Sequence, residues 1–113
     1  MTFGTMELIQ TVTVGSGGAA NIEFTNIPQT YDDLQVVFSV RSNRSTSAAD
    51  AVLMRVNSDT GNNYTYRRIT GSGTAATSNQ ETSVSYVLVS VVNTSTTTAN
   101  TFGNGQVYIP NLS

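Results

Sequence analysis

The strongest constraint on the fold is an alternation of apolar and polar side chains with a period of two residues. In "DLQVVFSVR", residues 33–41, the side chains of Leu34, Val36, Phe38 and Val40 fall on one side of an extended chain. Successive side chains of a β-strand point to opposite faces, so this run predicts a half-buried strand. No segment of the sequence shows the 3.6-residue period of an amphipathic helix.

The same alternation recurs along the chain, interrupted by residues that favour turns. Further strand-like runs are "MELIQTVTV" (6–14), "ANIEFTNI" (20–27), "AVLMRVN" (51–57), "YTYRRIT" (64–70), "SVSYVLVSVVN" (83–93) and "QVYIP" (106–110). The glycine-rich turn between the first two predicts a hairpin, and the polar stretch 71–82 predicts a long loop. About seven short strands with regular turns predict one all-β domain over residues 1–113, an antiparallel β-sandwich of jelly-roll or Greek-key type. Residues 1–6 are expected to form an extended N-terminal arm.

Composition excludes several classes of function. The chain has 113 residues, of which 18 are Thr, 13 Ser and 11 Asn, and it contains no His, Cys, Lys or Trp. The Ser-His-Asp and Cys-His arrangements and Schiff-base chemistry are therefore excluded, and zinc loses its two most common ligands. We expect no enzymatic activity, no cofactor and no metal. A net charge of -2 argues against nucleic-acid binding, and no apolar run is long enough to span a membrane.

The stretch "NSDTGNNYTYRRIT", residues 57–70, has an oxygen-rich turn that superficially resembles a calcium loop. Asn57, Asp59, Gly61 and Asn63 supply oxygens at alternate positions. An EF-hand, however, needs several carboxylates and a glutamate at its twelfth position, where this chain has Arg68. The stretch therefore predicts a hairpin turn in which Asn and Asp side chains bond their own backbone.

The end of this stretch carries a candidate contact site for a glycan or a protein partner. Tyr64 and Tyr66 are two residues apart and share a face of the predicted strand, beside Arg67 and Arg68. Such tyrosines could stack on a sugar ring whose hydroxyls the arginines bind. The alternative is cross-strand packing of tyrosine rings with the aliphatic stems of arginine.

The run 83–93 is apolar on both of its predicted faces. One face would carry Val84, Tyr86, Leu88 and Val92, and the other Val87, Val89 and Val91. A strand that is apolar on both sides is expected to be covered on both sides. We therefore predict Val87, Val89 and Val91, together with Phe3, as contacts to other copies of the chain or to a capsid.

Two segments carry a resemblance to a known group of proteins. The corner "IPQTYDDL" (27–34) and the hairpin "RVNSDTGNNY" (55–64) resemble those of small virion proteins of tailed bacteriophages, many of them from cyanophages. The likeness extends over nearly the whole chain, including the late "QVYIPN" strand. Those proteins usually continue beyond "YIPN", whereas this chain stops at Ser113. The expectation is either a minimal version of the fold or a fold in which a neighbouring copy supplies further strands.

The resemblance implies a structural role in a phage particle. The expected function is that of a capsid decoration (cement) protein, which binds between capsomers and stabilises the shell. Its expected partners are other copies of itself, as a homotrimer, and the major capsid protein, and its expected location is the capsid surface of the virion. The alternative is a tail or fibre component that binds carbohydrate of the host surface.

Overall fold

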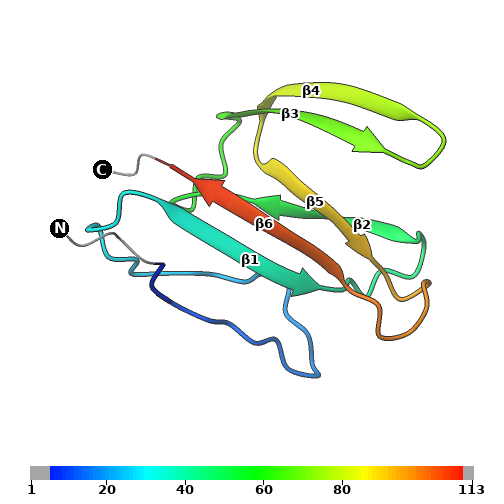
Figure 1. Cartoon of the computed structure of the whole chain (residues 1–113), viewed down its shortest axis with the longest axis horizontal. Coiled ribbons are helices and arrows are strands. Elements are labelled where there is room, and N and C mark those ends of the chain that lie inside the picture. Colours follow the sequence, from blue (N-terminus) through cyan, green and yellow to red (C-terminus); the bar gives the residue numbers. More distant parts are fainter. Residues whose placement is uncertain (1–5, 111–113) are drawn as a thin grey trace. The chain divides into compact units, whose positions relative to one another are not determined.

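The computed structural model describes residues 6–110 and contains six β-strands (Figure 1). They are β1 (Leu34–Val40), β2 (Ala49–Met54), β3 (Tyr64–Gly71), β4 (Ala76–Val84), β5 (Val87–Asn93) and β6 (Gly103–Ile109). Residues 6–110 contain no helix. The prediction of an all-β chain is confirmed, with six strands in place of about seven.

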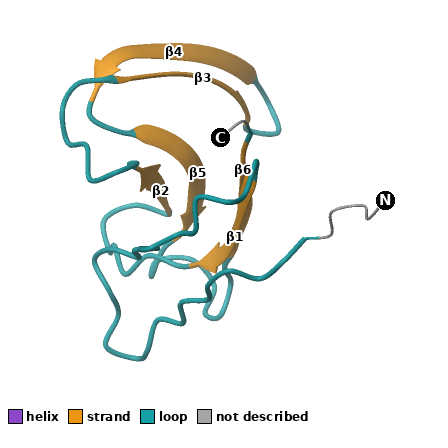
Figure 2. Cartoon of the chain, turned by 90° about the vertical axis from the view of Figure 1, so that its left-hand side faces the viewer, coloured by secondary structure: helices purple, strands orange, loops and turns teal. Residues whose placement is uncertain are grey.

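The strands pair antiparallel in three two-stranded sheets. β1 pairs with β6, β2 with β5, and β3 with β4, and the arrows of β1 and β6 run in opposite directions (Figure 1). Only β3 and β4 form a hairpin of consecutive strands, and they lie side by side in both views (Figures 1 and 2). The other two pairs join strands that are far apart in the sequence.

The chain divides into two units, which we describe separately. One comprises residues 1–34 and 109–113, and the other residues 35–108. In the first unit, residues 6–33 contain no strand, so the predicted N-terminal hairpin is wrong. The expected turn does form, with a hydrogen bond from the Gly18 amide to the Gly15 carbonyl at 3.0 Å. Turn residues alone do not make a hairpin, because two strands without a packed face are marginally stable.

The apolar side chains of this first unit are largely exposed. Met6 and Leu8 are 80% and 81% exposed, so the alternation in the sequence corresponds to no buried face here. One polar contact links the two ends of the segment: the Tyr31 hydroxyl donates to Glu7 Oε2 at 3.0 Å. This hydrogen bond to a carboxylate raises the pKa of Tyr31. The predicted arm, residues 1–6, falls almost wholly outside the described residues.

In the second unit, β1 follows the predicted alternation. The side chains of Val36, Phe38 and Val40 are half-buried, while those of Gln35, Val37 and Ser39 on the reverse face are mostly exposed. Leu34, at the start of the strand, continues the half-buried face.

β4 is a strand where the sequence predicted a loop. Its sequence, "ATSNQETSV", has no apolar alternation, and every residue from Ala76 to Ser83 is exposed. The strand forms because a β-ladder needs only backbone donors and acceptors, which β3 supplies across a short turn. That turn is closed by a hydrogen bond from the Ser72 amide to the Ala75 carbonyl at 2.9 Å. The predicted run 83–93 is correspondingly split, because β4 ends at Val84 and β5 begins at Val87.

A bulge in β5 changes which of its residues share a face. Val52 lies opposite Ser90, but the next residue of β2, Leu53, lies opposite Leu88, so Val89 has no partner. A bulge shifts the two-residue alternation by one position. The predicted face assignment is therefore wrong beyond the bulge.

The two faces of the β2–β5 pair follow from this register. Val87 opposes Met54 and Val92 opposes Asp50, which places both valines on the half-buried side. The outer side carries Leu88 opposite Leu53, and Val91 opposite Ala51. We call these four residues, Ala51, Leu53, Leu88 and Val91, the outer face of β2–β5.

The packed core of the described residues is small. Among residues 6–110, one hydrophobic side chain is buried, that of Val92, which is 4% exposed. Thr94, two residues further along the chain, is fully buried. A Cβ atom placed on Gly103 of β6 would lie 2.5 Å from Val92 Cγ1 and 2.8 Å from Val92 Cα. β6 therefore approaches Val92 more closely than any residue with a side chain would allow.

The loop between β5 and β6 is held by Arg41, which follows β1. Its guanidinium donates to the carbonyls of Thr97, Thr98 and Thr101 at 2.8–3.0 Å, and to two threonine hydroxyls. Because a planar guanidinium presents several donors in fixed directions, one side chain orders the whole loop. The threonine-rich composition of this segment thus has a structural use, since its carbonyls and hydroxyls surround a cation.

Candidate interaction surfaces

The loop between β2 and β3 is a self-contained hydrogen-bonded turn. The Asp59 carboxylate accepts from the Gly61 amide at 2.9 Å and from the Asn63 side-chain amide at 3.0 and 3.1 Å. These donors lower the pKa of Asp59 below its ordinary value of 3.8. The backbone bends here because Asn57 and Ser58 both take positive φ angles, of 53° and 56°.

This turn has the form predicted from its sequence, with an aspartate that bonds the local backbone. Both carboxylate oxygens of Asp59 are engaged by neighbouring donors. Within the described residues no three acidic side chains come together in a group that could hold a metal ion.

The first of the two predicted platform tyrosines has a structural partner. The Tyr64 hydroxyl donates to the Asp59 carbonyl at 2.9 Å and accepts from the Val56 amide at 3.2 Å. Tyr64 thus closes the loop that precedes its own strand. The Tyr66 ring lies 6.4 Å from the ring of Tyr86, with the two planes inclined at 33°, a spacing typical of an aromatic pair.

The structure separates the two adjacent arginines of β3. Tyr64, Tyr66 and Arg68 are half-buried and share one side of the strand, whereas Arg67 lies on the exposed side. Arg67 donates through Nε to Gln80 Oε1 at 3.0 Å across the β3–β4 pair. Of the four residues predicted as a glycan or partner contact, three therefore lie on one face and the fourth on the other.

Arg68 differs from the other arginines of the chain. Arg41 and Arg55 donate to backbone carbonyls, Arg55 at 2.7 Å to Ser85. Arg44 forms an exposed ion pair with Asp50 at 3.5 Å. The Nε of Arg68 is shielded from solvent and has no acceptor among the described residues. A buried donor without a partner is unusual and costs about 1–3 kcal/mol, which sets Arg68 apart from the other arginines.

The predicted contacts Val87, Val89 and Val91 do not lie on one face. The bulge places Val91 on the outer face of β2–β5, where it is 52% exposed, while Val87 faces the half-buried side with Met54. Leu53, which sequence reasoning missed as a contact residue, is 48% exposed beside it. The sequence of β2 alone does not show that Leu53 lies opposite Leu88 on this face, because that follows from the register between β2 and β5. Phe3, the fourth predicted contact, lies outside the described residues.

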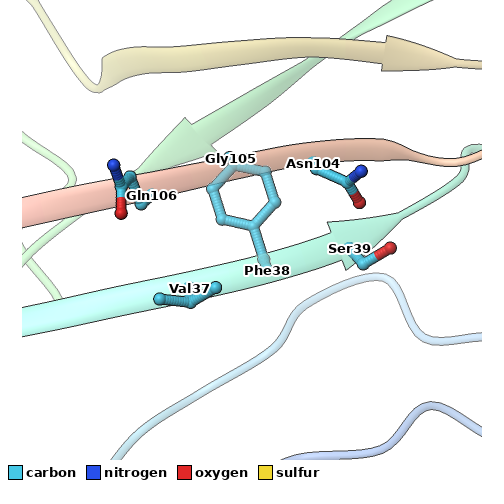
Figure 3. A pocket seen from close by; sticks show the side chains of 6 residues that line it. All are labelled: Val37, Phe38, Ser39, Asn104, Gly105 and Gln106. Atoms are coloured by element: carbon cyan, nitrogen blue, oxygen red, sulfur yellow. The ribbon is translucent and has the colours of Figure 1, made fainter.

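A shallow hollow of about 670 Å³ lies along the β1–β6 pair (Figure 3). It is lined by three consecutive residues of each strand, and none of these six residues is charged. Phe38 lies over Gly105 of β6, where an added Cβ would come within 2.4 Å of the ring. The lining of the hollow therefore contains no acidic or basic side chain. The Phe38 ring packs closely against Gly105 because Gly105 has no side chain.

Comparisons with protein-family profiles, with curated proteins and with solved structures found no match to this chain. No helix among the described residues is long and apolar enough to cross a membrane.

Proposed function

We propose that the chain is a structural protein of a bacteriophage virion, a capsid decoration protein that binds between capsomers and stabilises the shell. Its partners would be other copies of itself, in a homotrimer, and the major capsid protein. The two-stranded sheets would belong to a β-sandwich of jelly-roll or Greek-key type that neighbouring copies complete. The resemblance carried by residues 27–34 and 55–64 supports this proposal.

The structural observation that carries the proposal is the outer face of β2–β5. Leu53 and Val91 are about half exposed, and none of the four residues of this face is charged. An exposed apolar face rimmed by polar residues is characteristic of a protein contact surface. Each aliphatic side chain fully buried in such a contact contributes about 1.5–3 kcal/mol, and many weak contacts on a shell add through multivalency.

The decisive experiment is to locate the chain in a cryo-electron microscopy map of the phage particle that carries it. The proposal expects copies at regular positions on the capsid between capsomers. A location at the tail tip, or outside the particle, would overturn it.

A binding experiment tests the surface itself. We expect Leu53→Asp with Val91→Asp to abolish co-sedimentation with particles stripped of the protein, because two charges would be buried against an apolar partner. Val37→Asp is the matched control, since Val37 is an exposed valine of β1 outside this face. Equal binding by both variants would show that the outer face of β2–β5 makes no contact with the particle.

The second candidate function is binding of host carbohydrate at the tail. The observation that favours it is the pairing of Tyr66 with Tyr86 on the side of β3 that also carries Arg68. Loss of binding to host polysaccharide in Tyr66→Ala, measured by calorimetry, would support it. Intact binding in that variant would exclude it.

A further inference from the structure

One side of the β3–β4 hairpin gathers polar, aromatic and charged side chains, of which Tyr66 packs with Tyr86 of the same chain. Tyr66 lies directly opposite Glu81, and Arg68 directly opposite Asn79. Residues directly opposite each other in an antiparallel pair share a face, and so do residues two apart in one strand. We call these four residues, Tyr66, Arg68, Asn79 and Glu81, the ribbon face.

The ribbon face carries one positive and one negative charge that are unpaired among residues 6–110. Arg68 Nε is shielded from solvent without an acceptor, as described above. Glu81 is exposed, and the ion pair found among the described residues is that of Arg44 with Asp50. Arg68 and Glu81 are diagonal neighbours on the same face, yet they make no contact within hydrogen-bond distance.

β4 has little support within its own chain beyond its ladder to β3. β4 is exposed along its length from Ala76 to Ser83, on both of its sides. An isolated two-stranded hairpin is at best marginally stable, so this one gains from a surface that covers it. Tyrosine and arginine, which the ribbon face supplies from β3, are the residue types most enriched among the energetically dominant contacts of protein interfaces.

We propose that the ribbon face is a contact between two copies of this chain, in which Arg68 of one copy pairs with Glu81 of the second. The face is self-complementary, because one surface carries both charges. Around a closed ring, each Arg68 meets the Glu81 of the next copy. The inference rests on the proposed function only in that both require self-association, and it names the surface through which copies meet.

The opposite side of the same hairpin provides the internal control. Arg67 adjoins Arg68 in sequence and has the same charge, but it points to the other side and is already bonded to Gln80. A general effect of removing positive charge from β3 would appear equally in Arg67→Glu and Arg68→Glu. An effect of the proposed contact would appear only in Arg68→Glu.

The first experiment measures the mass of the full chain by analytical ultracentrifugation over a range of concentrations. We expect Arg68→Glu and Glu81→Arg each to weaken association by about 30-fold or more, because each places like charges in contact. The exchanged double variant, Arg68→Glu with Glu81→Arg, is expected to recover most of the wild-type association. Arg67→Glu is expected to associate like the wild type. A monomeric wild type, or an exchange that fails to rescue two folded single variants, would overturn the proposal.

The second experiment exploits the absence of cysteine from the chain. Chains with Arg68→Cys are mixed with chains carrying Glu81→Cys and oxidised. A disulfide between positions 68 and 81 can then form only between two copies. We expect this linked peptide pair in mass spectrometry. Folded chains whose thiols form no such link would contradict the proposed contact.

The outcomes separate this inference from the proposed function. An oligomer whose mass is insensitive to Arg68→Glu, found on the capsid, would overturn the inference and leave the proposed function intact. An oligomer that depends on these charges but is absent from the capsid would support the inference and overturn the proposed function. Loss of polysaccharide binding in Arg68→Glu with no change in mass would assign the ribbon face to a glycan and overturn the contact between copies.

Discussion

Gly103 and Arg41 show how few residues determine the packing of the second unit. Gly103 gives β6 access to the buried side chain of Val92, and Arg41 gathers the carbonyls of the loop that leads into β6. Gly103 acts because it has no side chain, and Arg41 acts through the several N–H donors of its guanidinium. In a chain with a small core, such single positions carry a large share of the specificity of packing.

At the residue scale we predict that Gly103→Ala destabilises the chain by about 1–3 kcal/mol, because the new methyl group meets the backbone of Val92 at 2.8 Å. Urea unfolding followed by circular dichroism would measure this change. Gly71→Ala is the control, since an added Cβ there has no atom within 4 Å. Equal midpoints for the two variants would show that β6 can move away from Val92 without cost.

At the scale of elements, the strands with an apolar period were predictable and the polar one was not. β1 has an uninterrupted alternation from Leu34 to Val40, which burial of one face requires. β4 has none, because it is exposed on both sides and depends on its ladder to β3. The sequence of residues 6–14 has the alternation and yet forms no strand in the described chain. A side-chain period is therefore neither sufficient nor necessary for a strand, because residues 6–14 have the period without burial or pairing and β4 pairs without the period.

The candidate surfaces were predictable to a similar degree. The common face of Tyr64, Tyr66 and Arg68 follows from the two-residue period within one strand. The roles of Leu53 and Glu81 depend on which residues lie opposite them. The register of a strand pair cannot be predicted from the sequence of one strand alone. The bulge at Val89 adds a shift that no local pattern in β5 reveals.

Two aspartates with lowered pKa values, Asp59 in the loop between β2 and β3 and Asp50 in β2, predict how the stability of the fold depends on pH. The pKa of Asp59 is lowered by Asn63 and the Gly61 amide, and that of Asp50 by Ser42 and the Ala51 amide. A carboxyl whose pKa is lower in the folded state stabilises the fold above its unfolded pKa, and this contribution is lost as pH falls through the folded pKa. Thermal midpoints should therefore decrease as pH falls below about 4.

The variant Asp50→Asn with Asp59→Asn tests this assignment. Without the two carboxylates, the midpoint should fall less steeply between pH 5 and about pH 2. Differential scanning fluorimetry of both proteins across this range would measure the slopes. Parallel curves would mean that other groups cause the acid sensitivity.

At the scale of the whole molecule, the proposed association between copies would link folding to assembly through exposed apolar and unpaired charged groups. Leu53 and Val91 are about half exposed, and Arg68 lacks an acceptor within the described chain. A chain whose surfaces are completed by other copies is stabilised by mass action, because association occurs only in the folded state.

We therefore predict that the thermal midpoint of the wild type rises with protein concentration, by several degrees over a hundredfold range. Arg68→Glu should reduce this rise, while Arg67→Glu should leave it unchanged. Scanning calorimetry at several concentrations would measure the dependence. A midpoint that does not vary with concentration would mean that the folded chain gains nothing from its neighbours.

The turn from Ser72 to Ala75 joins two strands whose flanking residues are exposed, and it is closed by its own local hydrogen bonds. A foreign peptide grafted into this turn would displace no packed side chain. If the proposed place of the chain on a phage shell is correct, one such graft would be repeated at every site, and this turn would suit the display of antigens or affinity tags.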